Sequence, residues 1–229
     1  KHANPRLFTL GDSVTLDAAV DEDGVPNLDT TNLVANLDGA DDGWLNQHDI
    51  TRFDNCQPVT LRVRVRRDPL AVTNVPLYLN AWFDGNRDGD WKDSRVCETG
   101  DTAYEWMVQN YKVKPLPALN GYVDIDVTTK PVLVNSAVNP AWVRITLSDQ
   151  NAITPTNPAG ALPDGRGLDT GYFDYGETED YLWDPVTVRE KYGDWSVTKS
   201  ITTSSPITVG STFNYVIEVS RTGGTQTNV

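Results

Sequence analysis

Apolar and polar residues alternate along several short segments of the chain. Residues 59–66 place three apolar side chains on one face of an extended chain and three arginines on the other. The same period of two recurs at residues 77–83, 121–127, 141–147 and 212–219. Alternation of this kind is typical of β-strands that bury one face. The pattern therefore predicts strands in all five segments.

Helical periodicity is nearly absent from the chain. The sequence allows at most a short helical piece at residues 102–109, and stretches rich in Gly, Pro and Asp separate the strands, as at residues 21–26, 38–43 and 154–160. Short strands joined by such loops are typical of an antiparallel β-sandwich. We therefore expect an all-β protein, a sandwich of the jelly-roll or Ig-like type. Its long acidic loops would carry whatever the scaffold displays.

The charge of the chain is negative and unevenly distributed. Lys and Arg number 19 against 32 Asp and Glu, which gives a net charge of −13 over 229 residues. This sign argues against a nucleic acid or an anionic membrane as partner, and no apolar run is long enough for membrane insertion. Residues 195–229 carry +1, so the rest carries −14. We therefore expect an acidic domain at residues 1–184, a linker at 185–194 and a β tail at 195–229.

One acidic segment, residues 82–93, places oxygen-bearing side chains at every second position. Asp84, Asn86 and Asp88 occupy the first, third and fifth positions of a D-x-[DN]-x-D-G loop. Asp90 can offer its main-chain carbonyl at the seventh position. Because Ca²⁺ takes about six to eight oxygen ligands, the segment predicts a calcium site that another part of the chain must complete.

The segment is not an EF-hand. An EF-hand carries a bidentate Glu at the twelfth loop position, where this chain has Arg95, and the preceding residues 77–83 read as a strand. The missing ligands can come from Asp93 or Glu98 just downstream, or from a distant acidic stretch. The alternative is a solvated turn without an ion, since Asp, Asn and Gly are also the commonest turn residues. Alternating carboxylate and amide oxygens repel each other without a cation, which favours calcium.

Cys56 and Cys97 are the only cysteines. Both lie in polar, turn-like surroundings beside predicted strands, and the pair is too sparse for a structural zinc site. We expect one disulfide formed in an oxidising compartment, worth about 4 kcal/mol by the loop-entropy estimate. It would tie the acidic loop to the strand that starts near residue 59. The alternative is two unrelated buried thiols.

A second acidic motif, Y-G-E-T-E-D-Y at residues 175–181, gives the chain a family resemblance. Together with W-F-D-G-N-R-D-G-D-W at residues 82–91 and the strand at residues 142–147, it resembles the GEVED domain of bacterial and archaeal surface proteins. The resemblance covers about residues 50–184. It implies an extracellular β-sandwich module of large multidomain proteins.

The resemblance also implies which residues close the calcium site. Carried over, Glu177, Glu179 and Asp180 become candidate ligands beside Asp84. Strand alternation would point Glu177 and Glu179 to one side and Asp180 to the other. In the alternative, these carboxylates pair with Arg144 or with the arginine face of residues 59–66. The family's short Gly-Glu step after the loop is absent here, which puts Glu98 in question as a ligand.

The tail has a resemblance of its own. Residues 197–202, 207–223 and 228–229 are similar to the opening half of the Ig-like repeat found in tandem in prokaryotic cell-surface proteins, and strand-like runs occur at residues 196–203 and 212–219. An isolated hairpin is marginal in water. We therefore consider two explanations: the tail completes the sheet of a neighbouring copy or module, or the sequence is part of a longer protein.

Nothing in the sequence points to an enzyme. Only two histidines occur, His2 and His48, and neither lies in a catalytic motif. The favoured function is a calcium-stabilised structural or adhesive module at the cell surface or in the extracellular space. One alternative is a filament subunit that donates its tail to a neighbour. Another is a carbohydrate-binding module with glycan partners, in which aromatic residues form a stacking platform; the candidates are Trp44, Trp82, Trp91, Trp106 and Tyr172.

Overall fold

The computed structural model describes residues 2–14, 41–71, 75–137, 139–152, 173–184, 194–201 and 215–222. The chain divides into two compact units, Lys1–Pro185 and Val186–Val229. The charge distribution predicts a linker at residues 185–194. Several expected features lie outside the described residues: the loops at 21–26 and 154–160, most of the linker, and Tyr172.

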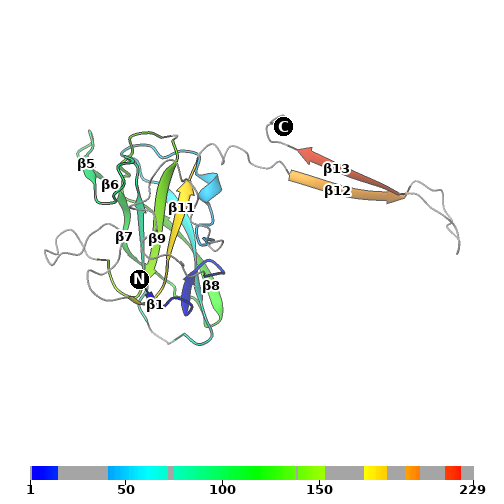
Figure 1. Ribbon diagram of the computed structural model, residues 1–229, viewed down its shortest axis with the longest axis horizontal. Helices are drawn as coiled ribbons and strands as arrows, with labels where there is room; N and C mark the ends of the chain where they lie inside the picture. Colours follow the sequence, from blue (N-terminus) through cyan, green and yellow to red (C-terminus); the bar gives the residue numbers. More distant parts are fainter. Residues whose placement is uncertain are drawn as a thin grey trace. The chain divides into compact units, whose positions relative to one another are not determined.

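Thirteen strands and one short 3₁₀ turn make up the described regular structure (Figure 1). The strands are β1 His2–Asn4, β2 Phe8–Leu10, β3 Thr60–Arg67, β4 Tyr78–Phe83, β5 Ser94–Val96, β6 Thr102–Tyr104, β7 Trp106–Lys112, β8 Gly121–Thr128, β9 Ala141–Ser148, β10 Phe173–Tyr175, β11 Thr178–Trp183, β12 Asp194–Ile201 and β13 Tyr215–Thr222, and the turn is η1 Gln47–Asp49. All five predicted segments contain a strand.

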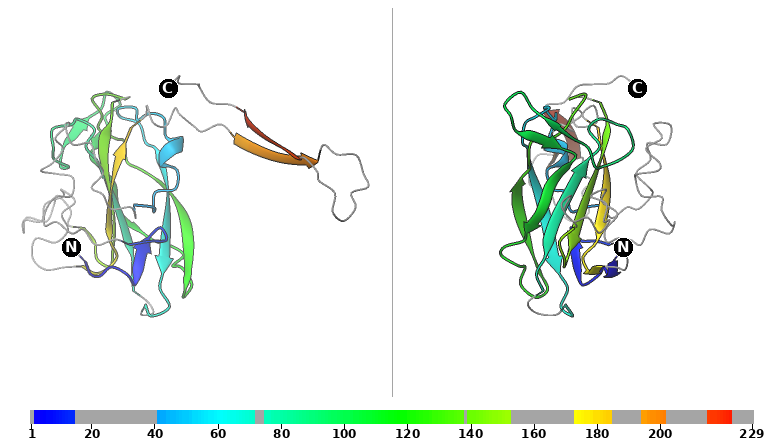
Figure 2. Two further views of the ribbon diagram at one scale, coloured as in Figure 1. Left: turned by 45° about the vertical axis from the view of Figure 1, so that its right-hand side comes forward. Right: turned by 90° about the vertical axis from the view of Figure 1, so that its left-hand side faces the viewer.

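The first unit is a β-sandwich of antiparallel sheets, as the sequence predicts. One sheet has the strand order β11-β9-β4-β7 and the other the order β2-β3-β8. The strands of both sheets run lengthwise through the unit (Figure 2). Two short pairs accompany them, β5 with β6 and, in parallel, β1 with β10.

The main core lies between the two sheets. From the three-stranded sheet, Leu61, Val63 and Val65 of β3 point inward, as the alternation of residues 59–66 predicts. From the four-stranded sheet, alternate residues of β4 and β9, among them Phe83 and Ile145, point toward the same core. Both strands are also buried on their other face, because a cluster of tryptophans covers it.

The expected helical piece at residues 102–109 is wrong. These residues form β6 and the start of β7, and β7 pairs with β4 through Val108 opposite Ala81 and Trp106 opposite Trp82. Local helix propensity is a weak preference that strand pairing and burial override. Strand β7 therefore becomes the edge of the four-stranded sheet, and β6 pairs with β5.

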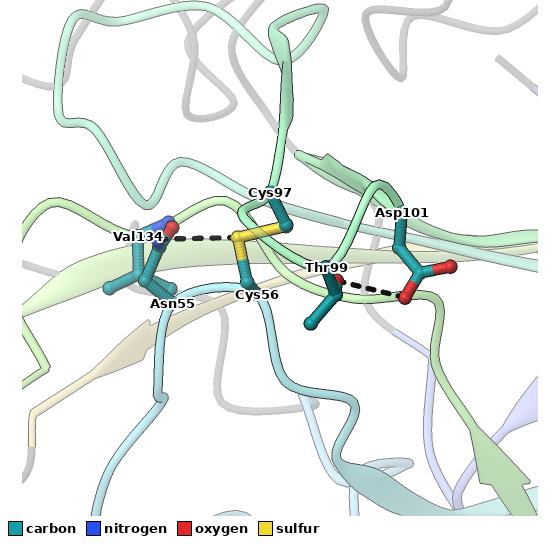
Figure 3. The surroundings of a disulfide bond; sticks show 6 residues. All are labelled: Asn55, Cys56, Cys97, Thr99, Asp101 and Val134. Carbon is teal, nitrogen blue, oxygen red and sulfur yellow. Dashed lines mark hydrogen bonds between the residues drawn. A yellow bond between two sulfur atoms is a disulfide. The ribbon is translucent and has the colours of Figure 1, made fainter.

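The predicted disulfide is present. Cys56 lies just before β3, and Cys97 lies in the turn between β5 and β6 (Figure 3). The Asn55 side chain supports the bond, because its Nδ2 donates to Cys56 Sγ (3.4 Å) and its Oδ1 accepts from the Val134 amide (3.1 Å). The disulfide therefore ties the β5–β6 hairpin to the segment that enters the main core.

The second unit is described as one antiparallel hairpin. Strands β12 and β13 pair along their whole length, with Val197 opposite Val219 and Lys199 opposite Ile217. Val216, Ile217 and Val219 are exposed within this unit. The two tail strands that the sequence predicts are therefore present, with β13 reaching Thr222.

Candidate metal centre

The acidic loop begins at the end of the central strand β4. The Asp84 amide donates to the Trp142 carbonyl of β9 (3.0 Å), so the first loop residue still follows the sheet register. The Asp84 carboxylate then accepts hydrogen bonds from the amides of Arg87 (2.8 Å) and Asp88 (3.2 Å). Two residues with positive φ, Arg87 at 64° and Gly89 at 89°, complete the turn.

The loop is also fixed to the chain segment before β9. The Arg87 guanidinium donates to main-chain carbonyls of the loop and of that segment, namely those of Gly85, Ser136, Asn139 and Pro140. Gly85 packs so closely that a Cβ atom there would lie 1.9 Å from the Leu133 carbonyl oxygen. Arg87 therefore holds two pieces of backbone together rather than neutralising the loop carboxylates.

Three carboxylates converge beside this loop. Asp84, Asp88 and Glu105 each offer one oxygen, and these three oxygens lie within 4.8 Å of one another. Two oxygens bound to one Ca²⁺ at about 2.3–2.6 Å are at most about 5 Å apart. Asp84 is 2% exposed and Glu105 is 0% exposed, while Asp88 faces solvent. The arrangement is therefore a cluster of two buried carboxylates and one exposed carboxylate.

Glu105 is the carboxylate that sequence reasoning missed. It lies between β6 and β7, where its amide donates to the Asp93 carbonyl (3.0 Å) and its carbonyl accepts from the Phe83 amide (2.9 Å). Its Oε2 accepts from the Asp93 amide (3.1 Å), whereas its Oε1 is buried and accepts no hydrogen bond from the described part of the chain. A lone acidic residue in the apolar run of residues 103–108 was the signal available in the sequence.

Burial and crowding disfavour the ionised state of these groups. Burial, reinforced by neighbouring carboxylates, raises the pKa of Asp84 to about 6 and the pKa of Glu105 to about 9. The same causes raise the pKa of Asp93. Buried carboxylates need a proton or a cation as partner. In the absence of a cation, these carboxyl groups therefore favour the protonated, neutral form.

Two further predicted ligands, Asn86 and Asp93, lie next to the three carboxylates. Asn86 Oδ1 accepts from the Asp88 amide (3.0 Å), and its Nδ2 donates to the carboxylates of Asp88 (2.9 Å) and Asp93 (2.7 Å). The Asp90 carboxylate instead pairs with Lys92, whose Nζ lies 3.3 Å from Oδ2. The main-chain carbonyl of Asp90 stays the predicted calcium ligand. Asn86 thus contacts Asp88 of the cluster directly, and Asp93 contacts Glu105.

The structure does not bring Glu98 to the loop. Glu98 is exposed in the turn between β5 and β6 and is not part of the carboxylate cluster.

The expectation that Glu177 and Glu179 close the site is wrong. The Leu147 amide donates to the Glu177 carbonyl, whereas Asp84 is bonded to Trp142. Five residues of strand β9 separate these positions, about 16 Å at the usual rise of about 3.3 Å per residue. Both glutamates also point toward the core side of the sheet, as alternation predicts. Strand register therefore places Glu177 at the far end of the sheet, while Glu179, opposite Ile145, is kept from the loop because it points toward the core.

Glu177 and Glu179 have structural partners instead. Glu177 Oε1 accepts from the Leu10 amide of β2. Glu179 Oε1 accepts from the amides of Asp42 (3.1 Å) and Gly43 (3.2 Å), and its Oε2 accepts from the Tyr181 hydroxyl (2.6 Å). These carboxyl groups therefore fasten β2 and the segment at residues 42–44 to strand β11.

Asp180 follows the alternative interpretation. It lies opposite Arg144 in the β11–β9 pair, and its two carboxylate oxygens accept from Nε (2.7 Å) and Nη2 (2.5 Å) of that arginine. It is therefore an ion-pair partner and not part of the carboxylate cluster.

Stability of the metal-free protein is predicted to fall as pH rises from about 5 to about 10. Burial raises the pKa of Glu177 from 4.5 to about 10 and the pKa of Glu179 to about 8. The folded state therefore holds these protons more tightly than the unfolded state, and this stability is lost as pH rises through the two folded pKa values. Urea unfolding in EDTA at pH 5.5, 7 and 9 measures it. Glu177→Gln should flatten the dependence, and a midpoint that rises with pH in the unsubstituted protein would contradict the prediction.

The aromatic platform expected for a carbohydrate-binding module does not exist in the described residues. Trp44, Trp82, Trp91 and Trp106 are all buried, and Tyr172 lies outside the described residues. Three of the tryptophans pack with Trp142 on the outer face of the four-stranded sheet. His48 is exposed at the η1 turn, as expected of a surface residue. The structure therefore removes the main argument for sugar stacking.

No family model matches the chain, and neither a curated protein nor a solved structure matches it at a significant level. The resemblance to the GEVED domain and to Ig-like repeats therefore stays a prediction from the motifs. Among the described residues, no helix has the length and apolarity needed to cross a membrane.

Proposed function

We propose that the first unit is a calcium-stabilised structural or adhesive module of an extracellular or cell-surface protein. The observation that carries this proposal is the convergence of Asp84, Asp88 and Glu105, with a fully buried Glu105 oxygen that has no hydrogen-bond partner in the described residues. An isolated surface turn would not need a buried carboxylate from a separate part of the chain, the junction between β6 and β7.

The chemistry of the donors favours calcium. The cluster consists of carboxylate oxygens, with Asn86 and Asp93 beside it, and it includes no His or Cys. Hard cations such as Ca²⁺ and Mg²⁺ prefer oxygen ligands, while zinc sites usually include nitrogen or sulfur. The carboxylates of Asp84 and Asp88 come from the acidic loop and that of Glu105 from the junction between β6 and β7. Such a set can adapt to the irregular geometry that Ca²⁺ accepts and Mg²⁺ does not.

The disulfide supports a location outside the cytosol. Disulfides persist mainly in oxidising compartments, and Cys56 and Cys97 form one here. Free calcium is also abundant outside cells, where weak extracellular sites with dissociation constants of about 10⁻⁴–10⁻³ M can fill. The ion would hold the acidic loop and the β5–β6 hairpin in one arrangement.

Calcium is predicted to raise the melting temperature of the protein. At a free calcium concentration about a hundred times the dissociation constant, binding adds about 2.7 kcal/mol to the free energy of unfolding. For a domain of this size that corresponds to about 5–11 °C. Differential scanning calorimetry of chelator-treated protein, with and without added CaCl₂, measures the shift. Equal midpoints at a calcium concentration about a hundred times the upper of these dissociation constants, about 0.1 M, would refute the proposal.

A second candidate function is a filament subunit that assembles through its tail. The exposed Val216, Ile217 and Val219 on the β12–β13 hairpin favour it, because an isolated two-stranded hairpin is marginally stable. A neighbouring copy or module would cover these residues by strand pairing. Deletion of residues 195–229 is expected to abolish assembly seen by light scattering. Assembly that persists after the deletion would eliminate this candidate.

A further inference from the structure

Asp180 and Arg144 form a buried ion pair near the candidate metal centre. The arginine side chain is 5% exposed and the aspartate side chain 16% exposed. Both carboxylate oxygens accept hydrogen bonds from the guanidinium, which fixes its plane as well as its position. Arg144 is the residue of β9 that pairs with Trp82 of β4, two residues before Asp84.

The guanidinium of this pair lies over a residue of the acidic loop. The Arg144 Cζ atom is 5.8 Å from the centre of the Trp91 ring. Trp91 directly follows Asp90 and is 0% exposed, packed among the other tryptophans of the outer face. The indole therefore attaches the second half of the loop to the four-stranded sheet. Arg144 forms part of the surface against which Trp91 packs.

The second half of the loop needs such an attachment. The first half is held by Asp84 at the sheet and by the Arg87 contacts, but Asp88 is exposed and must stay within 4.8 Å of the buried carboxylates. Hydrogen bonds hold Asp88 and Asp93 at the two ends of this half. If Trp91 moved, residues 89–92 between them would sample more conformations, and calcium binding would have to order them at a cost in affinity.

We propose that Asp180 is a positioning residue for the candidate metal centre, acting through Arg144 and Trp91 to hold loop residues 88–93 ready to bind calcium. This inference rests on the proposed function. Removal of the Asp180 carboxylate would take two charge-assisted hydrogen bonds from the Arg144 guanidinium and would loosen the packing around Trp91.

The other sheet contains a matched ion pair. Arg64 and Asp124 are also directly opposite each other, on β3 and β8, and make two hydrogen bonds of 2.8 Å and 3.1 Å. The Arg64 guanidinium also lies over an aromatic ring, that of Tyr122, at 4.1 Å. Asp124→Asn therefore removes the same charge and the same kind of contact on the sheet that does not contain the acidic loop.

Calcium titration calorimetry of the full chain tests the inference with Asp180→Asn and Asp124→Asn. Supporting groups around a metal site typically change affinity about 10-fold to 100-fold when removed, so we expect Asp180→Asn to weaken calcium binding about 10-fold and Asp124→Asn less than 2-fold. Both variants are expected to melt below the unsubstituted protein in EDTA. Asp180→Glu, which keeps a carboxylate, should recover most of the affinity.

Three results would overturn the inference. One is unchanged affinity in Asp180→Asn with a lowered melting temperature, which would show a structural role alone and would leave the proposed function intact. Another is an equal loss of affinity in Asp124→Asn. The third is an absence of calcium binding by the unsubstituted chain, which would overturn the proposed function as well. If Asp180→Asn does not fold, Trp91→Phe tests the last contact of the chain of three, and unchanged affinity in that variant would likewise refute the inference.

Discussion

Glu105→Gln is expected to abolish most of the stabilisation by calcium while leaving the metal-free protein at least as stable as before. Burial raises the pKa of Glu105 from 4.5 to about 9, so at neutral pH this carboxyl must take up a proton when the metal-free protein folds, and a neutral amide of the same shape removes that cost. In the presence of calcium the substitution removes the ligand that comes from outside the loop. The two effects have opposite signs, which a general loss of stability cannot imitate.

The size of the effect follows from the affinity. Loss of a direct ligand should weaken binding by at least the upper value of about 100-fold seen for groups that only support a ligand. At a calcium concentration that gave about 2.7 kcal/mol, the gain would then fall to about 0.4 kcal/mol. Calorimetric melting of Glu105→Gln with and without calcium measures this loss.

Glu98→Gln is the matched control for Glu105→Gln. It makes the same chemical change and the same change in net charge, but Glu98 is exposed in the turn between β5 and β6 and outside the carboxylate cluster. It should keep the full calcium-induced shift. If both variants lost the shift equally, the effect would reflect net charge rather than coordination. If neither lost it, Glu105 would not be a ligand.

Removal of the disulfide by Cys56→Ala with Cys97→Ala is expected to cost about 4 kcal/mol of unfolding free energy. The two cysteines are 41 residues apart, and the loop-entropy estimate for that separation is about 4 kcal/mol. The melting temperature should fall by roughly 8–16 °C for a domain of this size. Thermal unfolding followed by far-UV circular dichroism measures the change.

The same double variant is expected to weaken calcium binding several-fold. Cys97 lies on the hairpin between Asp93 and Glu105, so the disulfide holds the chain that carries both residues. Reduction of the unsubstituted protein with dithiothreitol is an independent way to open the cross-link and should reproduce both effects. A melting temperature unchanged by either treatment would contradict the prediction.

Most of the fold was predictable because its signal is local. A strand that buries one face alternates apolar and polar residues, and residues 59–66 show this pattern without any knowledge of their neighbours. Residues 102–109 lack such a pattern. Residues 106–109 form a strand because β7 pairs with β4 and buries Trp106 and Met107 on opposite sides. This pairing is a property of the assembled sheet.

The candidate site divides along the same line. Asp84, Asn86 and Asp88 belong to one turn of a few residues, so the sequence alone shows their spacing. The sequence also shows that Cys56 and Cys97 are the only cysteines that can pair. Which distant carboxylate meets the loop depends on which strands are neighbours and in what register. Glu105 reaches the loop because its backbone bonds to Phe83 and Asp93. Register places Glu177 at the far end of the sheet, turns Glu179 toward the core and leaves Asp180 opposite Arg144. The sequence by itself thus determined the all-β class, the strands with a regular alternation and the acidic loop, because each depends on nearby residues, and it determined the disulfide because the chain has only two cysteines. Only the tertiary structure decided which carboxylate joins that loop, because strand pairing between distant segments sets that choice.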